Sequence, residues 1–169
     1  MSIIFKMWFV AAILTIAATI VWSGKVVPLE QCPGESFEDL LDRVQVIPCG
    51  KSRCRLPRNT NATIILKFTT KKEVKVLRND VHADIGGVPF PFIGVDGTDA
   101  CQNLQRADTG EAVSCPLPAG HNYIYTNVFP ILAAYPTLEM RVHWGLKAGK
   151  DSMICFEVPA AITSGSKKN

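Results

Sequence analysis

The sequence predicts an all-β sandwich. Residues 138–147 alternate without error between apolar positions and positions that are polar or glycine, which is typical of a strand with one buried face. Several other short segments alternate in the same way and are separated by turn-forming residues. No segment has a convincing long helical repeat, so two packed layers of strands are expected.

Residues 1–23 are predicted to be a signal peptide. An almost unbroken apolar run fills residues 3–22, has its lone cation Lys6 near the start, and ends in the small residues Ser23 and Gly24. The run is long enough for a membrane span, which is the alternative. Cleavage near Ser23 or Gly24 would leave roughly 145 residues, which is the size of one domain. We therefore expect a secreted, extracellular protein, with the lysosomal lumen as the alternative location.

Charge excludes one class of partner. The whole chain has a formal net charge of +3, and removal of Lys6 with the signal peptide would leave about +2. Such a balance gives no electrostatic reason to bind nucleic acid, so we expect no nucleic-acid partner. We also expect a monomer.

The six cysteines at 32, 49, 54, 101, 115 and 155 all follow the predicted cleavage point. An even number in an exported chain predicts three disulfides, for which about 15 pairings exist in principle. Cys49 and Cys54 are close enough to pair locally, as are Cys101 and Cys115, which would leave Cys32 to pair with Cys155. Metal ligation by the cysteines is disfavoured because paired Cys-x-x-Cys units are absent from the sequence.

The first half of the chain is expected to hold short strands. An extended segment begins at Val44, and residues 36–43 have a helical spacing too short to predict a helix. Residues 62–70 and 73–77 are predicted strands with a turn between them. Asn61 begins an Asn-Ala-Thr sequon and is a candidate glycosylation site.

Residues 81–85 lead into the apolar segment 86–93, in which two prolines alternate with large hydrophobic residues. Proline withholds the N–H that a central strand must donate, so this segment is predicted at a sheet edge. Val88, Phe90 and Phe92 would share one face, because strand side chains alternate. An apolar wall beside an unsealed edge suggests the mouth of a pocket, and the alternative is an edge strand that packs into the core.

The strand pattern is clearer in the second half of the chain. Residues 94–120 read as a long loop without periodicity, ordered by a disulfide. Strands are predicted over 121–131, 138–147 and 153–162, and residues 164–169 are predicted to be a disordered tail. The side chains expected to face inward from the last two strands are Leu138, Met140, Val142, Trp144, Leu146, Ile154, Phe156 and Val158.

No motif in the sequence predicts catalysis. His82, His121 and His143 lie on three different segments and are expected to be surface or hydrogen-bonded structural residues. The sequence has no Gly-x-Ser-x-Gly, no phosphate-binding glycine loop and no His-Glu-x-x-His. We therefore expect no enzymatic activity, no cofactor and no metal.

The chain is rich in large aromatic residues, which could either pack the interior tightly or line a cavity between two sheets. A ligand in such a cavity would be mostly hydrocarbon, because the strands offer no inward charge to pair with an ion. The aromatic residues in question are Phe68, Phe90, Phe92, Tyr123, Tyr125, Phe129, Tyr135, Trp144 and Phe156.

These features together resemble the ML lipid-recognition domain family, most closely its secreted Niemann-Pick type C2 and arthropod members. The resemblance extends from about Val27 to Ile162 and rests on the order of several short motifs. They are Cys49-x4-Cys54, Gly87-Val88-Pro89-Phe90-Pro91-Phe92, Tyr123 with Tyr125, Pro130-Ile131 followed by Tyr135-Pro136, Val142-His143-Trp144, and Cys155-Phe156-Glu157-Val158-Pro159.

The resemblance implies an immunoglobulin-like β-sandwich of two antiparallel sheets with an internal apolar cavity. It implies the disulfides Cys32–Cys155, Cys49–Cys54 and Cys101–Cys115. It also implies ligand-binding roles: Phe92, Pro130, Ile131 and Tyr135 at the entrance, Trp144 in the interior, and Val88 on a rim that meets membranes or a partner protein in the sterol carriers.

Two departures from the sterol-transferring members are visible. Asp84-Ile85-Gly86 precedes Val88 where those members are more apolar, and the loop from Cys101 to Cys115 is longer. The resemblance therefore implies a carrier of a fatty acid, sterol or semiochemical, which a membrane or receptor protein could contact transiently.

The sequence is also compatible with two other functions. An innate-immune protein that presents microbial lipid to a receptor would need a basic rim, for which Lys71, Lys72 and Lys75 are candidates. A plain structural sandwich would have a filled interior without a cavity of a few hundred Å³ (~300 Å³ or more).

Overall fold

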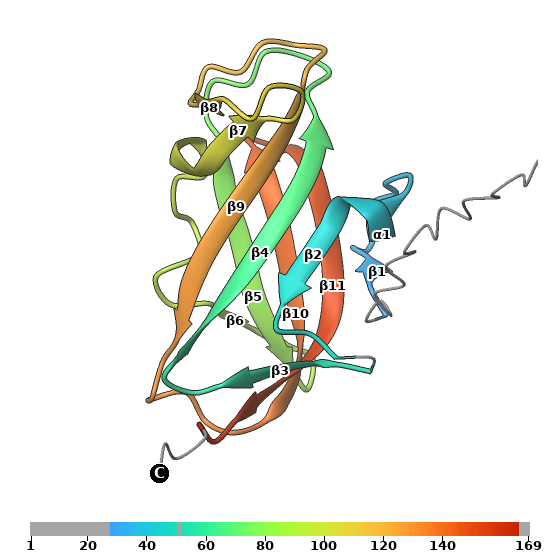
Figure 1. Ribbon diagram of the computed structural model, residues 1–169. Coiled ribbons are helices and arrows are strands. Elements are labelled where there is room, and N and C mark those ends of the chain that lie inside the picture. The colour runs from blue at the N-terminus through green and yellow to red at the C-terminus, as the bar shows by residue number, and fades with distance from the viewer. Residues whose placement is uncertain (1–27, 51, 166–169) are drawn as a thin grey trace, which may run out of the picture.

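The computed structural model describes residues 28–50 and 52–165 and confirms the predicted sandwich of two sheets (Figure 1). The predicted signal peptide, residues 1–23, lies outside this part of the chain, as do residues 166–169 of the predicted tail. Within the described ranges, no helix has the length and apolar character needed to cross a membrane.

Sheet A forms one layer and is antiparallel apart from one short parallel strand, β3, which pairs with the end of β11. Its strands, in spatial order, are β1 (Glu30–Gln31), β11 (Asp151–Thr163), β10 (Glu139–Ala148), β5 (Arg78–Ile85) and β6 (Val88–Pro91), with β3 (Cys54–Pro57) beside β11.

Sheet B forms the other layer and is antiparallel, and in Figure 1 it lies in front of sheet A. Its strands, in spatial order, are β2 (Val44–Ile47), β4 (Thr60–Thr69), β9 (Asn122–Ile131), β7 (Leu104–Arg106) and β8 (Ala112–Val113). The single-turn helix α1 (Leu40–Arg43) precedes β2, and the short 3-10 helix η1 (Cys101–Asn103) precedes β7.

The core lies between the inner faces of the two sheets, as the alternation of the long strands predicts. In β10, Met140, Val142, Trp144 and Leu146 are buried, whereas Arg141 and His143 face outward from sheet A and are partly exposed. The predicted strands over 121–131, 138–147 and 153–162 correspond to β9, β10 and β11. These strands are long enough for one face to bury continuous apolar surface, which stabilises the sandwich.

Three predictions about local structure were wrong. Residues 73–77 form no strand, because Val74 makes only an isolated bridge to Leu117. Segment 86–93 does not continue the preceding strand but folds back on it as the β5–β6 hairpin. Residues 94–120 are not one irregular loop, since they contain η1, β7 and β8.

The hairpin between β5 and β6 places β6 at the edge of sheet A, as its prolines predict. Gly86 and Gly87 have φ of 64° and 86°, which suits a two-residue turn in which both central residues have positive φ. The carboxylate of Asp84 accepts a hydrogen bond of 2.9 Å from the N–H of Gly87. Asp84, which departs from the apolar rim of the sterol carriers, therefore closes this turn.

Three disulfides join Cys32 to Cys155, Cys49 to Cys54, and Cys101 to Cys115, which confirms the implied pairing. The first spans 123 residues and ties the segment at β1 to the middle of β11. The other two close local loops of 5 and 14 residues.

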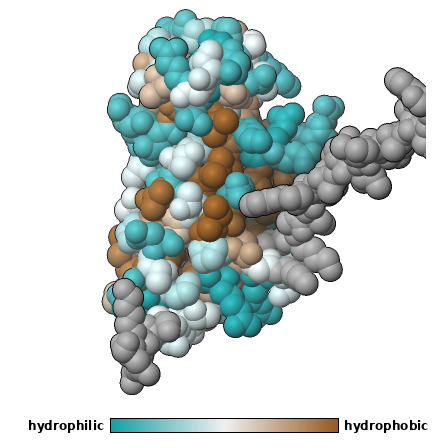
Figure 2. Space-filling model, in the orientation of Figure 1, coloured by the Kyte–Doolittle hydropathy of each residue, from teal (hydrophilic) through white to brown (hydrophobic). Residues whose placement is uncertain are grey.

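The outer face of sheet B carries exposed apolar side chains (Figure 2). In the register of that sheet, Ile47 and Val128 lie on either side of Thr63, and they are 45% and 57% exposed. Asn61 is exposed on β4, so the predicted glycosylation site is accessible.

Candidate functional site

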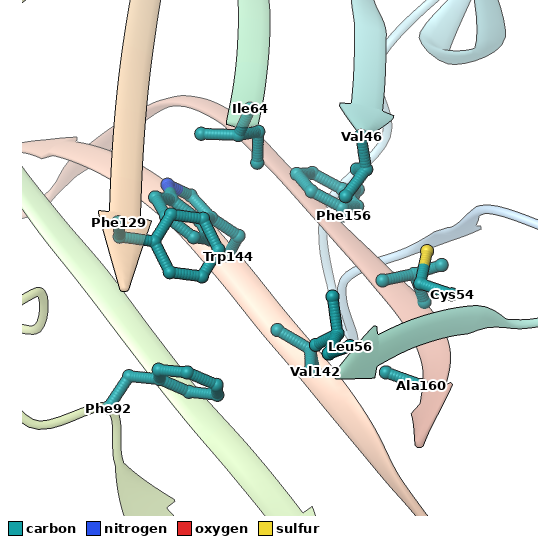
Figure 3. A pocket seen from close by; sticks show the side chains of 11 residues that line it. Val46, Cys54, Leu56, Ile64, Phe92, Phe129, Val142, Trp144, Phe156 and Ala160 are labelled. Atoms are coloured by element: carbon teal, nitrogen blue, oxygen red, sulfur yellow. The ribbon is translucent and has the colours of Figure 1, made fainter. Parts of the chain in front are cut away.

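A small apolar cavity lies between the two sheets (Figure 3). Its volume is about 20 Å³, which is close to the space that one water molecule occupies. The residues that line it come from both sheets and from the loop after β6: Val46, Cys54, Leu56, Ile64, Phe92, Phe129, Val142, Trp144, Phe156, Val158 and Ala160.

Trp144 lies in the middle of this lining, because the alternation of β10 turns it inward, and its side chain is 2% exposed. Its indole nitrogen Nε1 is buried and has no hydrogen-bond partner in the described part of the chain. A buried N–H without a partner destabilises a protein by about 1 to 3 kcal/mol. This donor is buried in the packing around the ring and does not face the cavity, whose lining is entirely apolar.

Four aromatic rings form a continuous series from the surface to the cavity. Tyr135 is partly exposed and makes an edge contact with Phe92, with ring centroids 5.5 Å apart. Phe92 makes a similar contact with Phe129 at 6.0 Å, and Phe129 packs on Trp144 at 5.1 Å. Figure 3 shows Phe92 beside the Phe129–Trp144 pair, on the loop that follows β6. Phe92 therefore separates the inner pair from Tyr135 and the solvent.

Backbone hydrogen bonds hold the loop that carries Phe92. The N–H of Phe92 donates to the carbonyl of Val81 at 3.0 Å, and the Phe92 carbonyl accepts from Val95 and Asp96 at 3.0 and 2.9 Å. The carboxylate of Asp96 in turn accepts from the N–H of Val81 at 2.8 Å. These bonds tie the loop to β5 at two points, which explains why Phe92 is buried although no strand contains it.

The surface beside this loop, here called the rim (Val88, Phe90 and Ile93), is apolar and exposed. Val88, Phe90 and Ile93 are 52%, 50% and 69% exposed, whereas Phe92 is 6% exposed. In the hairpin, Phe90 pairs with Ala83, whose side chain is buried, so Phe90 shares the inner side of sheet A. It is half exposed on the edge strand of sheet A.

Tyr135 has a polar end beside this rim. Its hydroxyl donates to the carbonyl of Ile93 at 3.5 Å, and partial burial raises the pKa of the phenol. The ring is therefore neutral across the physiological range and presents a weakly held hydroxyl at the entrance.

The structure brings together some of the predicted site residues and separates others. Phe92, Phe129, Trp144 and Phe156 line the cavity, and Tyr135 lies at its entrance. Val88 and Phe90 lie on the exposed rim. The remaining predicted residues lie elsewhere: Phe68, Tyr123, Tyr125 and Ile131 are buried outside the cavity lining, and Pro130 is exposed on β9.

Tyr125 belongs to a buried polar network. Its hydroxyl donates to the side-chain oxygen of Asn79 at 2.9 Å, and the amide of Asn79 donates to the hydroxyl of Thr98 at 3.1 Å. Burial raises the pKa of Tyr125. The network links β9 of sheet B to β5 of sheet A and to the loop after β6, which indicates a structural role.

Sequence reasoning missed seven of the residues that line the cavity. The inward faces of β10 and β11 were predicted, so Val142 and Val158 were expected in the core but not singled out as site residues. The others are Val46, Cys54, Leu56, Ile64 and Ala160. Which core residues surround the cavity depends on how the two sheets are stacked, and no local pattern carries that information.

Comparisons with known proteins agree with this architecture. Residues 26–162 match the family model described as the ML domain. The ecdysteroid-regulated 16 kDa protein of Manduca sexta is 33% identical over 68% of this chain and 74% of its own length. The NPC intracellular cholesterol transporter 2 of Sus scrofa is 28% identical over 74% of this chain and 78% of its own length.

A solved structure supports the fold. The Niemann-Pick type C2 protein from the Japanese carpenter ant superposes with a TM-score of 0.59 and 24% identity, over 71% of this chain and 89% of that chain. The family model spans most of the sequence and the ant protein has the same sandwich. This protein therefore belongs to the ML domain family.

Proposed function

We propose that the protein is a secreted carrier that binds one small hydrophobic ligand, such as a fatty acid, a sterol or a semiochemical, between its two sheets. The observation that supports this most is the apolar path from Tyr135 through Phe92 and Phe129 to Trp144. It leads from the surface into the space between the inner faces of the two sheets, which we call the seam. Relatives in the family include cholesterol transporters. The predicted signal peptide and the three disulfides support an oxidising, extracytoplasmic compartment.

The seam must open to accept a ligand. Its cavity of about 20 Å³ is far below the ~300 Å³ or more of a small-molecule site, as expected for a plain structural sandwich with a filled interior. Two features favour opening over permanent closure. The edge strand β6 carries prolines and cannot pair with a further strand. Phe92 lies on a loop whose backbone is held by hydrogen bonds, so its ring can rotate while those bonds stay in place.

The lining of the cavity is apolar throughout, so the ligand is expected to be mostly hydrocarbon. The buried Nε1 of Trp144 does not face the cavity, and it could donate to a ligand oxygen only if the indole ring turned as the seam opened.

The expected affinity is micromolar. Burial of roughly 400 Å² of ligand surface contributes about 10 kcal/mol at 25 cal/mol per Å². Lost ligand freedom and the contacts that must be broken inside the seam remove half or more of that gain. Binding is non-covalent, and the exposed rim of Val88, Phe90 and Ile93 would contact the membrane or protein that supplies or receives the ligand.

The test uses Trp144 as an internal reporter. A chain that begins at Lys25 keeps Trp144 as its single tryptophan, because the other two lie at positions 8 and 22. A fatty acid brominated on its chain should quench Trp144 emission saturably, since bromine quenches at contact, and unbrominated fatty acids or sterols should reverse the quenching. Absence of quenching at tens of micromolar (about 50 µM) would refute the proposal, because the energetic estimate predicts micromolar binding.

The receptor-presenting alternative has less support. β4 runs from the end of sheet B near the entrance, where Thr60 pairs with Ile131, to Thr69 at the other end, where it pairs with Asn122. The lysines at 71, 72 and 75 follow Thr69, so they lie away from the rim. Lys72 also forms an ion pair with Asp151. Capture of a receptor protein from the source fluid by ligand-loaded protein would favour the alternative over simple carriage.

A further inference from the structure

The outer face of sheet A brings together three metal-ligand side chains from two strands. Asp80 and His82 are two residues apart in β5, so they point to the same face, and His143 of β10 lies directly opposite His82 in the register. All three are partly buried, with side-chain exposures of 31%, 30% and 13%. This cluster is separated from the seam by the sheet, and the seam does not use it.

The distances within the cluster are close to those of a zinc site. The Nδ1 atom of His82 lies 4.0 Å from one oxygen of Asp80, and the Nε2 atom of His143 lies 3.9 Å from the other. The three ligand atoms all lie within 4.8 Å of one another. Tetrahedral zinc with bonds of 2.0–2.1 Å needs ligand atoms about 3.4 Å apart, so the Asp80 distances must shorten by about 0.5 Å.

Side-chain rotation can supply this change. The two imidazole rings are stacked, with centroids 4.3 Å apart and planes inclined by 17°. Stacked rings direct their lone pairs in parallel, so the rings must tilt toward a common point to hold one ion. The terminal torsion of histidine has a broad energy minimum, and the partly exposed ring of His82 has room to turn.

The surroundings orient His143 for this role. Its Nδ1 atom lies 3.3 Å from a carboxylate oxygen of Glu157 on β11, which fixes the other nitrogen, Nε2, on the side of Asp80. A carboxylate behind a histidine ligand is the usual outer partner at zinc sites. The sulfur of Cys155 lies 3.3 Å from Nε2, and since it belongs to a disulfide it is not a thiolate ligand.

Gly145 leaves space beside the cluster. It lies between Asp80 and Cys155 in the register, and a Cβ atom placed on it would contact the Cys155 sulfur at 3.5 Å and the Cβ of Asp80 at 3.7 Å. One cation competes for the site, because Lys147 Nζ lies 2.5 Å from an oxygen of Asp80. An incoming ion must displace this ammonium group.

We propose that Asp80, His82 and His143 bind one zinc ion on the outer face of sheet A, with water at the fourth position. Two imidazoles and one carboxylate are a ligand set that suits zinc and disfavours magnesium and calcium, which prefer oxygen ligands. The ion links β5 to β10 and does not depend on the lipid-carrying function.

The test is calorimetric titration of the untagged mature chain with Zn²⁺ alone. We expect one ion per chain and no comparable heat with Mg²⁺. H82Q should weaken binding at least about 100-fold, because loss of even an outer partner weakens metal sites 10- to 100-fold. H121Q is the matched control, since His121 lies outside the cluster, beside Tyr123, and it should bind zinc as the wild type does.

A second variant guards against misfolding. D80N replaces a carboxylate with an amide of the same shape and should also weaken zinc binding. Because it breaks the ion pair between Asp80 and Lys147, circular dichroism of the metal-free variant must show that it is folded at the titration temperature. Zinc should raise the thermal midpoint of the wild type and of H121Q, and leave folded H82Q and D80N unchanged. Wild-type affinity in H82Q, equal binding of Mg²⁺, or no zinc binding by the wild type would each overturn the assignment.

Discussion

Phe129 and Trp144 pack against each other across the seam in a tilted arrangement, with ring centroids 5.1 Å apart and planes inclined by 49°. Phe129 belongs to β9 of sheet B and Trp144 to β10 of sheet A, so the pair joins the two layers. A ligand that enters between the sheets must separate these rings. The same contact therefore stabilises the empty protein and opposes ligand entry.

Replacement of Phe129 by alanine should destabilise the protein by about 3 to 5 kcal/mol, because Phe129 is 6% exposed and its removal leaves space in the seam. The free energy of unfolding in urea measures this loss. Val128→Ala is the matched control on the same strand, because Val128 is 57% exposed, and it should change stability by about 0.5 kcal/mol or less. Equal losses in the two variants would show that the seam is not packed as described.

Removal of the ring of Phe92 should speed both ligand entry and ligand release, because this ring lies between Tyr135 and the inner pair. Stopped-flow quenching of Trp144 by a brominated fatty acid gives both rates. Phe90→Ala is the control, since Phe90 precedes it by two residues but is 50% exposed. If F90A changed the rates as much as F92A, ligand would enter by another route.

The length of the ligand chain should determine its affinity. Each methylene buried in the seam contributes about 0.8 kcal/mol, which corresponds to an approximately four-fold tighter Kd per added carbon. Displacement titrations with a series of saturated fatty acids measure this slope. A flat series would indicate that the acyl chain stays in water and that only the polar group is recognised.

Stability should fall at high pH partly through Tyr125. Burial raises the pKa of this phenol in the folded protein, so as pH rises the unfolded chain ionises first, near pH 10. The stabilisation is therefore complete below about pH 10 and is lost between that pH and the higher pKa of the folded state.

Tyr125→Phe tests this expectation. At pH 8 the variant should be less stable by about 1 to 3 kcal/mol, because the side-chain oxygen of Asn79 loses its donor. The difference from the wild type should narrow as pH rises above 10, which urea unfolding at several pH values would reveal. A constant difference would mean that Tyr125 ionises equally in the folded and unfolded states.

The three disulfides should contribute unequally to stability. On the chain-entropy model, the link between Cys32 and Cys155, which spans 123 residues, contributes about 5 kcal/mol. The link that spans 14 residues contributes about 3 kcal/mol, and the one that spans 5 residues about 2 kcal/mol. Paired cysteine-to-serine variants, compared by urea unfolding, should follow this order, and a reversed order would show that strain or unfolded-state structure dominates.

The long strands were predictable because each carries its own signal. Residues 138–147 alternate over a full strand, so the inward position of Trp144 follows from local sequence alone. Some short strands were predictable, such as β2 from Val44 and the edge strand β6, but the segment 73–77 was predicted wrongly. Val74 and Val76 alternate with charged residues, yet Val76 is 53% exposed and the segment pairs only at Val74, so alternation without a neighbouring strand does not make a strand.

Which residues from distant segments become neighbours could not be predicted from the sequence. His82 and His143 are 61 positions apart and become neighbours only through the register of β5 and β10. The size of the cavity is set by how side chains of two sheets interdigitate, and the aromatic content of the sequence is compatible with either a filled or a hollow seam. The local spacing of the cysteines and the family resemblance agreed on the disulfide pairing, whereas the proposed entrance at Phe92 came from the resemblance alone.

The closeness of the two layers, which leaves a void of about 20 Å³, has a consequence for the unloaded protein. A protein with a permanent large cavity would expose apolar surface to any hydrophobic compound in solution and to other copies of itself. Because the two layers nearly fill the space between them, the apolar core is shielded from water and from other copies, and a ligand would enter only if its binding returned more free energy than separation of the layers consumes.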